Sequence, residues 1–148
     1  MDKLSKVQFY ILSFTWGLLV NTAGSFVALI MLITGHRPKH HGWCVYFEIG
    51  KKAWGGMEWG IFFITDKTGS THVKNHEFGH AIQNCFFGPF MIFISLQSTI
   101  RYWYRRISSK FGKKHKHGYD HIWFERQATR LGTEYIIRIN GVTDTSGI

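Results

Sequence analysis

The sequence predicts a small α+β domain preceded by a membrane-anchoring helix. Three observations support this fold class: an uncharged apolar stretch at residues 7–34, two short segments with strand-like alternation between residues 43 and 65, and two later helical patterns. A chain of 148 residues has room for one domain, or for a small domain and an anchor. We therefore assign residues 1–34 to the anchor and residues 35–148 to the domain.

The N-terminal apolar stretch runs from Val7 to Thr34, over 28 residues without a charge. A helix needs about 20 residues to cross a bilayer, so we expect a tilted or kinked transmembrane helix, interrupted by the polar and small residues at 21–25. A cleaved signal peptide is the alternative, with Lys3 and Lys6 as its basic start. The anchor is favoured because residues 26–33 are as apolar as those before the interruption.

The charge of the chain favours a lipid surface over nucleic acid as its partner. The formal net charge is +9, and aromatic residues make up 17% of the chain. A basic run at residues 110–117 can bind the phosphates of nucleic acid or of lipid headgroups. Beside an apolar segment, such a run is more typical of contact with anionic headgroups. Basic residues at positions 37, 39, 51 and 52, after the anchor, favour a cytoplasmic location for the domain.

A second apolar segment, residues 86–107, is expected to contact the membrane without crossing it. Its apolar part, residues 86–100, is short for a span, and the alternating aromatic residues and arginines at 101–106 suit the headgroup level. A crossing would also separate two later predicted helices, because the helix that begins near residue 120 would lie on the opposite side of the bilayer from the helix at 73–87. We therefore predict a re-entrant or interfacial segment.

Two strand candidates lie between the anchor and the first helix of the domain. Residues 43–50 alternate between two faces, residues 57–65 form the second strand, and Gly55-Gly56 lies in the connection. Two roles stay open for this pair: an edge that binds an extended peptide, or a hairpin that only covers the neighbouring helix. The two cysteines, Cys44 and Cys85, do not indicate a disulfide framework, and Cys85 is expected to be a small core residue.

An H-E-x-x-H motif at residues 76–80 is the strongest functional feature of the sequence. It lies within a helical pattern, residues 73–87, that Gly88-Pro89 is expected to end. Positions i and i+4 of a helix share a face, so the imidazoles of His76 and His80 can bind one metal ion. Glu77 then lies beside the water that the metal activates, where a carboxylate can accept a proton. The alternative is a pair of histidines on a solvated helix face.

A third metal ligand is expected downstream, because a catalytic zinc site usually has three protein ligands. The candidates are Glu125, Asp120, His121 and His72. Glu125 is preferred because it lies among apolar residues of the last helix, where a carboxylate needs a strong partner. That helix is expected to begin with Asp120 as its N-cap and to end at Gly132.

The residues from Asn75 to Gly132 resemble a group of small, largely uncharacterised bacterial and phage membrane-associated zincin-like metallopeptidases. The matching features are the pattern H-E-x-G-H-x-x-Q at 76–83, the Gly-Pro break at 88–89 followed by an apolar segment, and E-x-x-A-x-x-x-G at 125–132. The N-terminal apolar segment is a weaker match.

The resemblance implies zinc bound by His76, His80 and Glu125, with Glu77 as the general base and the bacterial plasma membrane as the location. The chain departs from the pattern at Thr129, where the family has an aspartate that in Glu-ligand zincins typically hydrogen-bonds a ligating histidine. Loss of that carboxylate is expected to cost about 10- to 100-fold in metal affinity or activity.

The expected function is therefore a membrane-associated zinc metallopeptidase that cleaves peptides or membrane proteins. Tyr119, His121 and His72 are the candidates for stabilising the transition state, and Thr129 for orienting a ligand. One alternative is a zincin-like membrane scaffold that binds zinc without turnover. The reason for this alternative is that Thr129 stands where the family pattern has an aspartate. Another is a metal-free membrane interaction protein that acts through the basic aromatic residues 101–116. The sequence does not predict an oligomeric state.

Overall fold

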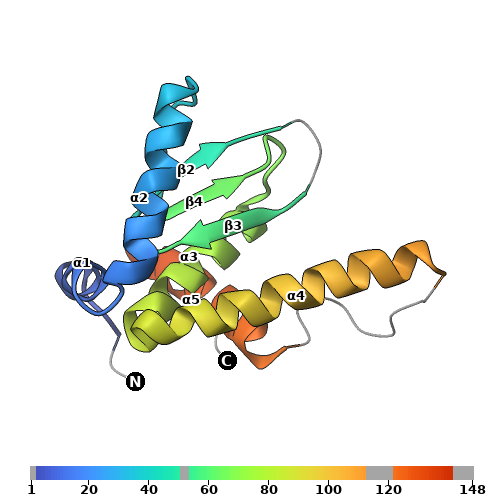
Figure 1. Cartoon of the computed structure of the whole chain (residues 1–148). Coiled ribbons are helices and arrows are strands. Elements are labelled where there is room, and N and C mark those ends of the chain that lie inside the picture. The colour runs from blue at the N-terminus through green and yellow to red at the C-terminus, as the bar shows by residue number, and fades with distance from the viewer. Residues whose placement is uncertain (1–2, 51–53, 113–121, 142–148) are drawn as a thin grey trace.

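The computed structural model describes residues 3–50, 54–112 and 122–141, and it confirms a mixed α+β fold (Figure 1). A small sheet lies between one N-terminal helix and the helix that carries the H-E-x-x-H motif. In chain order the elements are α1 (Lys6–Phe14), α2 (Leu18–Ile33), β1 (Lys39–His41), β2 (Cys44–Glu48), β3 (Gly56–Trp59), β4 (Phe62–Thr65), α3 (Thr71–Phe87), the short 3-10 helix η1 (Gly88–Phe90), α4 (Met91–Lys110) and α5 (Trp123–Ile139).

The sheet has the strand order β1-β2-β4-β3, with β2 and β4 parallel and the two outer pairs antiparallel. The prediction of a single strand at residues 57–65 is wrong, because this segment is the hairpin β3–β4 with a turn at Gly60 and Ile61. Gly60 has a φ of +71°, which an L side chain rarely adopts. The Ile61 N–H donates to Asn21 Oδ1 of α2 at 2.7 Å, so a residue distant in sequence fixes the turn.

The apolar stretch that was expected to form one tilted or kinked helix forms two helices, because α1 and α2 are bent by 90° at residues 15–17. Trp16 Nε1 donates to the Phe86 carbonyl at 3.2 Å, and a Cβ on Gly17 would lie 2.5 Å from Asn84 Nδ2. The bend therefore packs directly against the end of α3. Among the described residues, no single helix is both long and apolar enough to cross a bilayer, although α1 and α2 together meet those criteria by length and composition.

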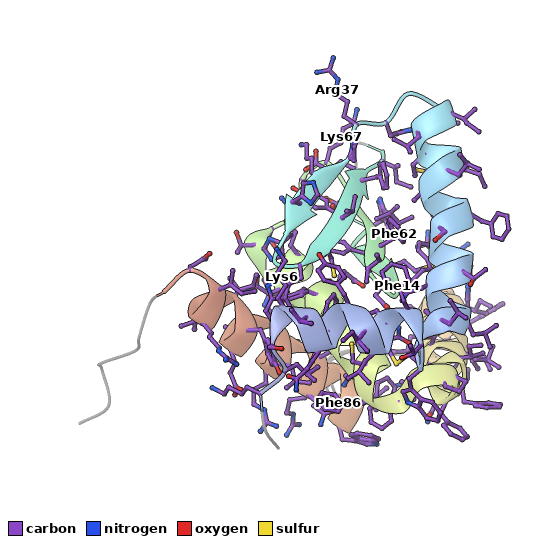
Figure 2. All side chains as sticks on the ribbon, turned by 90° about the vertical axis from the view of Figure 1, so that its left-hand side faces the viewer. Lys6, Phe14, Arg37, Phe62, Lys67 and Phe86 are labelled. Atoms are coloured by element: carbon purple, nitrogen blue, oxygen red, sulfur yellow. The ribbon has the colours of Figure 1, made fainter. Side chains whose placement is uncertain are left out.

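The polar and small residues at 21–25 do not interrupt the helix as expected, because α2 is continuous through them. Instead they let α2 approach the β3–β4 hairpin. A Cβ on Gly24 would overlap the Trp59 carbonyl and lie 3.1 Å from the Phe62 ring. Figure 2 shows Phe62 between the sheet and α2, while other side chains project from the outer side of that helix.

The core between the sheet and α3 is largely aromatic. Phe78 of α3 is fully buried and makes edge-to-face contacts with Phe9 and Trp43, at ring separations of 6.2 and 6.0 Å. Trp43 also contacts Tyr135 of α5, which ties the N-terminal helix, the sheet and the C-terminal helix together. Cys85 is 3% exposed within this core, as predicted.

Helices α3 and α5 pack backbone to backbone through two glycines. A Cβ on Gly79 would overlap the Ala128 carbonyl, and a Cβ on Gly132 would overlap the Asn75 carbonyl. The prediction that α5 ends at Gly132 is wrong, because the helix continues to Ile139. A glycine inside a helix weakens it locally, but here the close approach of a second helix requires one.

Substitution of Gly132 by alanine is expected to lower the free energy of unfolding by about 1–3 kcal/mol, because the added methyl group has no space against α3. Chemical denaturation followed by circular dichroism measures this change. Arg130→Ala on the exposed side of the same helix is the control, with an expected change within about 0.5 kcal/mol. Equal stability of the Gly132→Ala and wild-type proteins would contradict the close packing.

Helix α4 contains most of the second apolar segment and extends away from the rest of the fold (Figure 1). It begins after the turn at Gly88, where φ is +52°, and runs for 20 residues. Large apolar residues project from one side of it into the surroundings. The exposed members are Ile92, Phe93, Leu96, Ile100, Trp103, Tyr104 and Ile107.

Candidate metal centre

Three side chains from α3 and α5 converge on one point. Glu125 Oε2 lies 3.0 Å from His76 Nε2 and 3.2 Å from His80 Nε2, and the two Nε2 atoms are 3.1 Å apart. These three residues form a group that can hold a metal ion. The structure thus brings together the three residues that the sequence predicted as metal ligands.

Local helix geometry produces this convergence. The two histidines are one turn apart on α3, and both rings project from the face that meets α5. Helix α3 begins at Thr71, two residues before the predicted start, because Ser70 caps it by accepting a hydrogen bond from the Val73 N–H at 3.3 Å. Glu125 lies in the first turn of α5 and is 1% exposed.

The Nδ1 atom of each histidine has a hydrogen-bond partner that fixes the orientation of the ring. His76 Nδ1 lies 2.8 Å from Thr129 Oγ1, and His80 Nδ1 lies 2.9 Å from Gln83 Oε1. Gln83 is in turn held by its Nε2, which donates to the Phe124 carbonyl at 2.8 Å. With the Nδ1 proton directed to these oxygens, both Nε2 atoms present lone pairs to the shared point.

Thr129 occupies the position where the resembling family has an aspartate, and its hydroxyl makes the contact expected of that carboxylate. The same hydroxyl lies 3.3 Å from the Glu125 carbonyl, to which it can donate while accepting from His76. A neutral hydroxyl orients the ring but adds no negative charge to it. The threonine therefore fixes the orientation of the His76 ring without the negative charge that an aspartate would place beside it.

Substitution of Thr129 by valine is expected to weaken metal binding by about 10- to 100-fold, because His76 loses the partner that orients it while side-chain volume is retained. Competition with a chromogenic zinc chelator measures the affinity. Thr133→Val on the next turn of α5 is the matched control, because Thr133 Oγ1 donates to the Thr129 carbonyl rather than to a histidine ring. Equal affinities of the two variants would show that the hydroxyl does not orient the ligand.

Buried charges dominate the electrostatics of this cluster. Burial by itself lowers the pKa of His80, but the hydrogen bond with Glu125 and the negative charges of Glu77, Glu125 and Glu58 outweigh it and raise the pKa to about 9. In the metal-free protein a proton on His80 therefore compensates the buried carboxylate. A divalent cation can replace that proton, because it offers a larger charge to the same three atoms.

Glu77 lies next to the metal-binding group and is buried between α3 and the sheet. A Cβ on Gly56 of β3 would come within 2.6 Å of Glu77 Oε1, so the glycine provides the space for this carboxylate. Burial raises the pKa of Glu77, with Glu125 adding to the effect and His80 and His76 opposing it. A carboxylate with a raised pKa is a better proton acceptor near neutral pH.

A cavity opens in front of the cluster, and four elements line it. Its polar wall contains the residues of the cluster, whereas α4 forms an opposite wall that is mainly apolar. The lining residues are His76, Glu77 and His80 from α3, Gly56, Met57 and Glu58 from β3, Met91, Ile94, Ser95, Thr99 and Trp103 from α4, Phe124 and Glu125 from α5, and Trp54.

The remaining predicted residues are not brought into this cavity by the described parts of the chain. His72 is exposed in the first turn of α3 and does not line the cavity. Tyr119, Asp120 and His121 lie outside the described residues, and α5 has Ile122 at its N-cap position. Glu58 also lines the cavity but was not predicted as a site residue, because a single strand at 57–65 does not reveal the β3–β4 hairpin on which it lies.

Comparisons with known proteins identify no relative: no protein-family model matches the chain, and neither a curated protein nor a solved structure matches it. The resemblance to zincin-like metallopeptidases therefore stays a prediction from the motifs.

Proposed function

We propose that the chain is a zinc metallopeptidase in which His76, His80 and Glu125 bind the metal. The observation that carries the proposal is the spacing of the three ligand atoms, 3.0–3.2 Å from one another. Tetrahedral zinc with bonds of about 2.0–2.1 Å separates neighbouring ligands by about 3.3 Å. Two imidazoles and one carboxylate also leave the fourth position of such a site open.

The residues around the metal have the roles that peptide hydrolysis requires. When bound, zinc would polarise the scissile carbonyl and lower the pKa of the attacking water. Glu77 accepts a proton from that water and passes it to the leaving amine. Thr129 and Gln83 keep the histidine rings in the metal-binding orientation.

The edge strand β3 supports a peptide as the substrate. In the part of the chain that the structure describes, β3 pairs with β4 on one side only, and its residues Gly56, Met57 and Glu58 line the cavity. An extended peptide that pairs with this edge passes directly in front of Glu77 and the metal ligands. Of the two roles that the sequence left open for the strands, we therefore propose peptide binding.

The metallopeptidase proposal is tested with the full chain purified in detergent. Mass spectrometry of the metal content is expected to show near-stoichiometric zinc, and a peptide library is expected to be cleaved. A chelator should abolish cleavage, and zinc should restore it. Protein that binds no zinc, or cleavage that is insensitive to the chelator, would overturn the proposal.

We further propose that α4 lies at a membrane surface, with its apolar side in the lipid. The large residues Phe93, Leu96 and Ile100 are 69%, 54% and 60% exposed on one face of the helix. On a helical wheel Arg101 and Arg106 lie on either side of this face, where their long side chains can reach anionic headgroups. Apolar residues on the outer side of α2 add to the exposed surface.

A fluorophore attached at position 96 is expected to shift to shorter wavelengths when the protein binds vesicles that contain anionic lipid, because the apolar side of α4 enters the lipid. Leu96→Cys carries an environment-sensitive dye, and Ser109→Cys, on the other side of the helix, carries the same dye as control. Native Cys44 and Cys85 are buried and should not react. Identical spectra at the two positions would contradict the orientation of α4.

A further inference from the structure

Glu58 is a buried carboxylate in the cavity that the proposed hydrolysis does not use. It is 9% exposed and lies at the position of β3 that faces α3, two residues after Gly56, opposite Phe63 of β4. Within the described residues its hydrogen bond is to the Gly60 N–H, and no lysine or arginine forms an ion pair with it. Among the described residues, its second carboxylate oxygen has no hydrogen-bond partner.

The charge balance of the cavity indicates what such a ligand should carry. A bound divalent cation contributes +2, whereas Glu125, Glu77 and Glu58 contribute three negative charges when ionised. One negative charge is left over in a cavity with apolar walls, where an unpaired carboxylate is costly. Burial raises the pKa of Glu58 to about 8, and a cationic group beside it would favour the ionised form. A single positive charge from the ligand would balance the site.

The position of Glu58 is also suited to contact with a peptide. It lies on the edge strand that lines the cavity, on the same face as Gly56, which contacts Glu77. Trp54, Met57 and, from α4, Met91 and Ile94 line the same cavity. A cationic group bound there would be surrounded by apolar side chains, which strengthen a charge-assisted hydrogen bond by excluding water.

We propose that Glu58 binds a primary ammonium group of the substrate and so determines which peptides are cleaved. The ammonium group belongs either to the N-terminus of the peptide or to a lysine side chain. The inference rests on the proposed peptidase function, and it adds a substrate class to that function: peptides with a primary amine close to the scissile bond.

Glu58→Gln separates this role from a structural one. Glutamine has nearly the same shape and keeps an oxygen that can accept the Gly60 N–H, but it lacks the negative charge. If Glu58 had only a structural role, its replacement by glutamine would change the selectivity for amine-containing peptides little. The matched control is Glu134→Gln on the exposed side of α5, which removes a carboxylate outside the cavity.

The test compares kcat and KM for matched peptides that differ in one amine. If the wild type binds the N-terminal amine, N-acetylation of the peptide is expected to lower kcat/KM by about 10- to 100-fold, mainly by raising KM. If it binds a lysine side chain, replacement of that lysine by norleucine should have the same effect. In Glu58→Gln the amine and amine-free peptides should be cleaved equally. Retained selectivity in Glu58→Gln, or equal cleavage by the wild type, would overturn the proposal.

A binding measurement keeps this inference distinguishable from the peptidase proposal. Zinc-loaded Glu77→Gln protein is titrated by calorimetry with leucinamide and with N-acetyl-leucinamide, and with a lysine-containing peptide and its norleucine counterpart. Stronger binding of the peptide or amide with the free amine supports the inference even if no peptide is hydrolysed, provided that the difference disappears in the Glu58→Gln/Glu77→Gln double variant. Equal binding of both forms of each pair would contradict it even if hydrolysis is observed.

Discussion

Replacement of Glu77 by glutamine is expected to lower kcat for peptide hydrolysis by about 10²- to 10⁴-fold while zinc stays bound. Glutamine fills the space that Gly56 leaves for this side chain, but it cannot accept a proton from the attacking water. The metal ligands are unchanged, so the metal content should equal that of the wild type. Initial rates on a cleaved library peptide, with zinc measured in the same samples, test this expectation.

The control for this experiment is Glu48→Gln on β2, where the carboxylate forms a surface ion pair with Lys39 at 2.7 Å. That variant should retain the activity of the wild type. If Glu77→Gln were as active as the wild type, Glu77 would not be the general base. If neither protein cleaved any peptide while both bound zinc, a zinc-binding scaffold without turnover would be the better interpretation.

Replacement of Glu125 by alanine is expected to weaken zinc binding by more than about 100-fold. Loss of a residue that only orients a ligand costs about 10- to 100-fold, and Glu125 is itself a proposed ligand. It is also the residue that both histidines contact, at 3.0 and 3.2 Å, so its removal leaves two imidazoles without a carboxylate. Chelator competition measures the affinity.

Thermal unfolding gives a second measurement for Glu125→Ala. A metal that binds only the folded state raises the melting temperature, so zinc should stabilise the wild type and leave the variant nearly unchanged. Glu134→Ala, a similar change at an exposed position of α5, should behave as the wild type. Equal zinc stabilisation of Glu125→Ala and the wild type would exclude Glu125 as the third ligand.

The three candidate ligands could be predicted from the sequence because the position of each has a local cause. His76 and His80 share a face of any helix that contains them, whatever that helix packs against. Glu125 was identifiable because a carboxylate among apolar residues needs a partner. The structure places it within 3.2 Å of both rings, although 45 residues separate it from His80.

The bent N-terminal segment and the full length of α5 were decided by tertiary contacts. The sequence alone predicted a break where Asn21 and Gly24 lie, but these residues serve the packing of α2 on the hairpin. Likewise, a glycine such as Gly132 is typical of a helix end, yet α5 continues to Ile139, and the glycine allows α3 to approach its backbone. At these positions local propensity favours a break or an end of the helix, whereas packing against another element favours a continuous helix.

The amino-acid sequence by itself determined the α+β fold class, the helix that carries the H-E-x-x-H motif and the choice of the three candidate ligands that the structure brings together, because helical periodicity and the cost of a buried charge act over short distances. Only the tertiary structure decided that Gly56, Glu58 and α4 enclose the same cavity. Their placement depends on a hairpin turn fixed by Asn21 and on the packing of helices across the sheet. Contacts of this kind join residues that no local pattern connects.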